Sequence, residues 1–92
     1  MNLKEAIELI DPEIEIELKE HIASKLFDDS DFEDGVLRGR LSQMKREVEV
    51  FKIINEAMVL GEDYINTKIY ETNEKRIEAL NILIKHLEEV LK

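Results

Sequence analysis

Carboxylates are the side chains of this chain with the greatest potential for chemistry, because 22 of its 92 residues are Asp or Glu. A carboxylate-only magnesium site in an all-helical nucleotide hydrolase needs two acidic pairs, each three residues apart, turned toward each other from neighbouring helices. That local spacing occurs in three pairs, Glu17 with Glu20, Asp28 with Asp31, and Glu71 with Glu74. No apolar framework directs two of these pairs at one another. A magnesium-dependent hydrolase is therefore the alternative and not the principal interpretation.

The two histidines do not fit a metal or catalytic site. A di-iron bundle uses Glu-x-x-His pairs, but the residue three before His21 is Leu18 and the residue three before His86 is Leu83. We interpret both histidines as residues at the surface or boundary of a helix. The chain has no cysteine, which excludes disulfides and thiolate metal sites. We predict no catalytic residue, no metal and no cofactor.

The acidic stretch 28–35 has a composition that suggests calcium, but its spacing does not fit. An EF-hand loop has oxygen ligands at positions 1, 3 and 5, glycine at position 6 and glutamate at position 12. With Gly35 at position 6, Phe32 occupies position 3 and Leu41 occupies position 12. We interpret the stretch as a solvated connection between helices.

A basic stripe raises the alternative of nucleic-acid binding. Arg38, Lys45 and Lys52 recur every seven residues, as positions on one side of a helix do. Glu49 and Glu56 lie among them, and a chain with a net charge of -9 would repel a phosphate backbone. Salt bridges are the better account of the stripe, and we do not expect nucleic acid as a partner.

The net charge is concentrated in the first third of the chain. Residues 1–35 contain twelve acidic residues and three lysines, which gives -9, whereas residues 36–92 contain ten acidic and ten basic residues. An electrostatic function would therefore belong to the N-terminal segment.

The N-terminal segment is predicted to form two short helices. Asn2 is placed to cap a helix from Leu3 to about Ile10, and Asp11-Pro12 is typical of a new helix start. Residues 13–18 alternate as a strand would, but a longer pattern with a spacing of four favours a helix to about Phe27. That pattern consists of Ile14, Leu18, Ile22 and Leu26.

A long third helix is predicted from Ser30 to Leu60, about 45 Å in length at 1.5 Å per residue. Apolar residues follow a heptad pattern along it, interrupted by one polar residue, Asn55, which can specify register. Gly61 suits a left-handed helix end. A second apolar stripe lies on the opposite side of the helix, which predicts neighbours on two sides. It consists of Val50, Ile53, Ala57 and Leu60.

Residues 63–92 are predicted to form either one helix, bent in places, or two pieces broken near Thr72, and we favour one helix. It has a broad apolar face. The fold class is therefore all-α: a small helical bundle, with an acidic N-terminal helical segment over residues 1–29 and a long antiparallel helical hairpin over residues 30–92. We expect two-fold dimerisation to complete the bundle. The predicted oligomer seam consists of Leu37, Leu41, Met44, Val48, Phe51, Asn55, Met58, Ile77, Leu80, Ile84, Leu87 and Leu91.

These features favour a non-enzymatic protein–protein interaction module, such as a small acidic regulator, inhibitor or adaptor. The expected partner is a protein with a basic surface, and one mechanism in this class is mimicry of a nucleic acid by carboxylates. The chain lacks a membrane-spanning stretch and a signal sequence, so a cytoplasmic location is expected. The predicted docking face is acidic and consists of Glu13, Glu15, Glu17 and Glu20.

Overall fold

The fold is all-α, as predicted. The computed structural model describes residues 1–26, 30–61 and 67–92, and the side chains within these ranges except those of residues 24–26 and 30–34. The described part contains four helices and no strand. They are α1 (Leu3–Ile10), α2 (Glu13–Leu26), α3 (Ser30–Leu60) and α4 (Thr67–Val90).

Local hydrogen bonds explain where the first two helices begin and end. The Asn2 side-chain Oδ1 accepts a hydrogen bond from the backbone N–H of Glu5 at 2.9 Å, which caps α1 as predicted. The backbone N–H of Asp11 donates the last helical hydrogen bond of α1, to the Ile7 carbonyl at 2.9 Å, and the extended backbone of Asp11 then ends the helix. The Asp11 Oδ1 accepts from the N–H of Glu13 at 3.0 Å and so begins α2. Two residues, Asp11 and Pro12, therefore separate the two helices, and Asp11 contributes hydrogen bonds to both.

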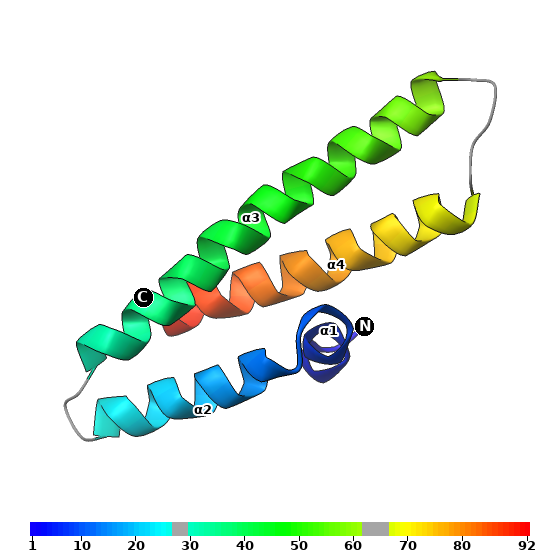
Figure 1. The fold of residues 1–92 in the computed structure, drawn as a ribbon. Coiled ribbons are helices and arrows are strands. Elements are labelled where there is room, and N and C mark those ends of the chain that lie inside the picture. The colour runs from blue at the N-terminus through cyan, green and yellow to red at the C-terminus, as the bar shows by residue number, and fades with distance from the viewer. Residues whose placement is uncertain (27–29, 62–66) are drawn as a thin grey trace.

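The molecule is a rod with a thicker end. Helices α3 and α4 form a long antiparallel hairpin, α1 lies across α4, and α2 runs beside the first half of α3 (Figure 1). The molecule measures 57 × 20 × 17 Å. Its radius of gyration is 15.8 Å, compared with about 12 Å for a compact domain of this length. The N-terminal helices therefore cover only one part of the hairpin.

The hydrophobic core lies where all four helices meet. Its largest fully buried aliphatic side chains are Ile14, Leu37, Leu80, Leu83 and Leu87. Helix α4 is continuous through Thr72, so a break at that residue does not occur. The predicted start of this element at residue 63 lies outside the described residues, as do residues 28 and 29 of the acidic stretch 28–35, whereas α3 begins at Ser30 within that stretch.

The inner face of α2 differs from the predicted one. Ile22 is 60% exposed, and His21, interpreted from the sequence as a surface or boundary residue, is only 1% exposed. The reason is geometric, because a step of four residues advances about 40° beyond a full helical turn. Two such steps from Ile14 carry Ile22 off the inner face, whereas a step of four to Leu18 followed by a step of three keeps His21 on it.

The end of α3 also differs from the prediction. Gly61 donates its backbone N–H to the Ala57 carbonyl at 3.0 Å, and its φ lies outside the left-handed region. The helical hydrogen-bond pattern therefore continues to this residue instead of reversing there. In the described part of the chain, no helix combines the length and the hydropathy that crossing a membrane requires.

Candidate interaction surface

The residues of the predicted oligomer seam lie inside the single chain. Within one chain, α3 and α4 pack along this seam, and its role between chains stays a prediction. The fully buried members are Leu37, Met44, Val48, Asn55, Leu80 and Leu87. The half-buried members are Leu41, Phe51, Met58, Ile77, Ile84 and Leu91.

The part of the hairpin that extends beyond α1 and α2 has two buried asparagines between its helices. We call this part the distal arm; it comprises residues 49–61 of α3 and its end, and residues 67–78 of α4. Asn55 and Asn73 are the only described residues of the arm that are buried. Asn73 Nδ2 donates to Asn55 Oδ1 at 3.0 Å, and Asn55 Nδ2 donates to Glu74 Oε1 at 3.0 Å. Asn55, the polar residue of the predicted seam, therefore forms these hydrogen bonds within the chain.

The outer face of α3 in the distal arm is apolar. We define this outer face as Val50, Ile53, Ala57 and Leu60, which lie opposite the seam. Ile53 is 63% exposed and Leu60 is 80% exposed, and Val50 and Ala57 are exposed as well. Scattered apolar residues are normal on a protein surface, but a contiguous apolar stripe marks an interaction site. In the distal arm the two buried side chains are amides, the apolar residues between the helices are only half-buried, and an apolar stripe is exposed on the outer face.

We expect Asn55→Ala to lower the free energy of unfolding by about 1–2 kcal/mol, because it leaves the Asn73 amide without its acceptor in a buried site. Urea denaturation followed by circular dichroism measures this change. Asn81→Ala is the matched control, since Asn81 is an exposed asparagine on α4, and it should change stability by less than about 0.5 kcal/mol. Equal stability of the two variants would contradict the buried amide pair.

An arginine, Arg40, binds some of the carboxylates of the predicted acidic docking face and leaves the others exposed. Arg40 of α3 donates two hydrogen bonds to the Glu17 carboxylate, from Nε at 3.0 Å and from Nη2 at 2.9 Å. Its Nη1 lies 3.0 Å from Asp11 Oδ2, and Glu13 lies 3.9 Å from Nη2. The hydrogen bond with Glu17 raises the pKa of Arg40, with smaller contributions from the charges of Glu17 and Asp11 that oppose desolvation. Glu17 is therefore engaged within the molecule.

The remaining acidic residues of α2 face outward. Glu20 is exposed, and Glu15 makes an exposed ion pair with Lys19 at 3.5 Å. Such exposed pairs contribute little to stability, so the Glu15 carboxylate can exchange its partner at small cost. Glu15 and Glu20 are the members of the predicted face that an external basic surface can reach without disturbing Arg40.

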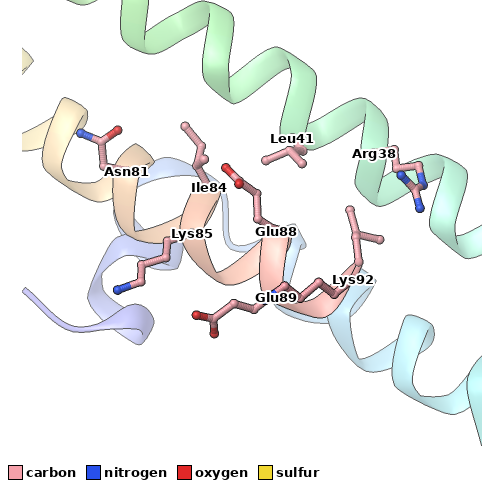
Figure 2. A pocket seen from close by; sticks show the side chains of 9 residues that line it. Arg38, Leu41, Asn81, Ile84, Lys85, Glu88, Glu89 and Lys92 are labelled. Atoms are coloured by element: carbon pink, nitrogen blue, oxygen red, sulfur yellow. The ribbon is translucent and has the colours of Figure 1, made fainter.

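Two residues of the basic stripe on α3, Lys45 and Lys52, make ion pairs. Lys45 lies 3.8 Å from Glu88 of α4, and Lys52 lies 3.9 Å from Glu49. Near Arg38, a shallow pocket of about 520 Å³ separates α3 from the last turns of α4. Figure 2 shows Arg38 and Leu41 on the α3 side and side chains of both charges on α4. This mixture of charges does not select an anionic or a cationic ligand.

In the carboxylate pairs of the hydrolase alternative, as in the acidic docking face, single carboxylates are engaged by other side chains of the chain. Glu17 binds Arg40 and Glu74 binds Asn55, so each has a partner other than the second acid of its pair. Asp28 lies outside the described residues. Among the residues that the structure describes, no group of three His, Cys, Asp or Glu side chains is placed to hold a metal ion.

Comparison with protein-family models, with curated proteins and with solved structures finds no match. Function is therefore inferred from the surface and the charges of this chain itself.

Proposed function

We propose that this chain is a cytoplasmic, non-enzymatic protein–protein interaction module, a small regulator, inhibitor or adaptor. The observation that carries the proposal is the exposed apolar stripe on the outer face of the distal arm. Ile53 and Leu60 are exposed on its outer face, while Asn55 and Asn73 are buried and hydrogen-bonded to each other between its helices. Exposed aliphatic side chains in a continuous stripe are stabilised when a partner removes them from water, at about 25 cal/mol per Å² of apolar surface.

The acidic surface of α2 supports the same proposal at the other end of the molecule. Glu15 and Glu20 are exposed there, and the N-terminal segment contains the whole excess of negative charge. A basic partner surface would be steered toward this end by charge, with an association rate that falls as salt concentration rises. The module thus offers an apolar face and an acidic face that are separate in space.

Affinity purification from the native cells with matched variants tests the proposal. We expect Ile53→Asp, or the pair Glu15→Gln with Glu20→Gln, to remove at least one protein that the unmodified chain retains, while the helical content stays the same. Glu17 is left intact because its substitution would disturb Arg40. An identical set of retained proteins for the unmodified chain and for both variants would overturn the proposal.

A further inference from the structure

We infer that the outer face of α3 in the distal arm binds the same face of a second copy of this chain, in an antiparallel two-fold dimer. This inference rests on the proposed function, because it names the occupant of the apolar face. Four observations support it: the exposed apolar stripe of the arm, its small net charge compared with that of the N-terminal segment, the position of the acidic end, and the residues that face each other along α3.

No apolar side chain in the described part of the distal arm is buried, and those between its two helices, Phe51, Met58, Tyr70 and Ile77, are half-buried. Most helical stability in proteins comes from tertiary packing of an apolar face, and isolated helices are marginal in water. Here the two buried residues of the arm are asparagines, and Val50, Ile53 and Leu60 are 48%, 63% and 80% exposed. A second helix against the outer face would supply the missing apolar layer.

Charge favours a second copy as the occupant. Residues 49–78 contain seven acidic and four basic side chains, a net charge of -3, compared with -9 for residues 1–35, so two distal arms repel each other less than two N-terminal segments would. The excess of negative charge belongs to residues 1–35, and α1 and α2 lie away from the tip of the hairpin (Figure 1). An antiparallel overlap of two distal arms places the two acidic ends at opposite ends of the dimer. A parallel overlap would bring them together.

The residues along α3 are complementary to themselves in the antiparallel register. With the two-fold axis between Ile53 and Ile54, Val50 of one copy faces Ala57 of the other. Arg46 of one copy then faces the end of α3 at Gly61 of the other. The carbonyl end of a helix is partly negative, and the last turn of α3 contains no basic residue of its own. The second copy would therefore provide the positive charge that this helix end lacks.

Sedimentation of the purified chain tests the dimer. We expect the unmodified chain to be a dimer at high micromolar concentration and Ile53→Asp to raise the dissociation constant at least about 100-fold, because each copy would bury a carboxylate at the axis. Ile16→Asp is the matched control: Ile16 is 58% exposed and Ile53 is 63% exposed, but Ile16 lies on α2. The control should leave the dimer intact, and equal weakening by both variants would overturn the inference.

Cysteine cross-linking tests the orientation, since the chain has no cysteine of its own. Under oxidation by molecular oxygen, Ile53→Cys should form a disulfide with its own copy, because residues at the axis come within bridging distance. Val50→Cys should link to Ala57→Cys in a mixture but not to itself. A Val50→Cys self-linked dimer would indicate a parallel arrangement and overturn the inference.

The result for the unmodified chain separates the inference from the proposed function. A monomer at high micromolar concentration overturns the second copy as occupant. If Ile53→Asp nevertheless removes a protein retained in affinity purification, the interaction module stands and its partner is a different protein. If the chain is a monomer and the retained proteins do not change with either variant of the affinity purification, both proposals fail.

Discussion

Replacing Leu83 with alanine is expected to lower the free energy of unfolding by about 3 kcal/mol, within the range of about 2–5 kcal/mol for such changes in a packed core. Leu83 is fully buried in α4, the helix that contacts both α1 and α3. The substitution removes apolar contacts and leaves a cavity that the surrounding helices can fill only in part. For a chain of this size, the melting temperature should fall by on the order of 15 °C.

Thermal and urea unfolding at one fixed protein concentration measure this loss. Leu9→Ala provides the control, because Leu9 is 45% exposed on α1 and its truncation should cost less than about 1 kcal/mol. Similar losses for Leu83→Ala and Leu9→Ala would show that the four-helix core is not packed as described.

The second large effect is expected for Arg40→Met, which keeps much of the aliphatic stem of the side chain and removes the guanidinium group. We expect a loss of about 2–3 kcal/mol, because Glu17 is only 18% exposed and would lose a two-point, charge-assisted hydrogen bond. The same substitution removes the contact with Asp11 at the junction of α1 and α2. Both N-terminal helices should therefore loosen from the hairpin.

A double-mutant cycle distinguishes this coupling from a general effect of losing charge. Arg40→Met and Glu17→Gln together should cost less than the sum of the two single substitutions, since each alone already breaks the pair. Arg38→Met is the control, because Arg38 is an exposed arginine on the same helix. Additive losses in the cycle would contradict a direct Arg40–Glu17 interaction.

The contribution of Arg40 should also persist at alkaline pH. Its pKa is raised by the hydrogen bond with Glu17. A cation with a raised pKa in the folded state contributes stability that is complete below its ordinary pKa and is lost only as the pH rises through the folded value. That window lies at strongly alkaline pH, so the stability difference between the unmodified chain and Arg40→Met should stay constant between about pH 7 and pH 10.

Much of the fold could be predicted because its determinants are local. The Asn2 cap, the role of Asp11 at the start of α2 and the limits of α3 depend on residues within a few positions of each other. Helical periodicity alone also defined which residues of α3 share the heptad face, although the sequence interpretation assigned that face to contact between chains. Which element covers that face is a different question.

The candidate surface depended on contacts between residues that are distant in the sequence. Arg40 and Glu17 are 23 residues apart, and no local pattern distinguishes Glu17 from the other acids of α2. Asn55 was recognised as the polar residue in the seam, but Asn73, its partner 18 residues later, was not. The position of Asn73 four residues before Ile77, on the face that α4 turns to α3, was the signal that could have indicated the pair.

Local sequence was enough to predict the all-helical class and the starts of the first three helices, because helix caps and helical periodicity act over one or two turns. Tertiary structure decided which polar groups are engaged and which apolar residues remain exposed. It turned Glu17 to Arg40, buried His21 instead of Ile22, and left Ile53 on the outside. The physical reason is that burial and ion pairing depend on which helices pack together, and α1 and α2 cover only part of the hairpin.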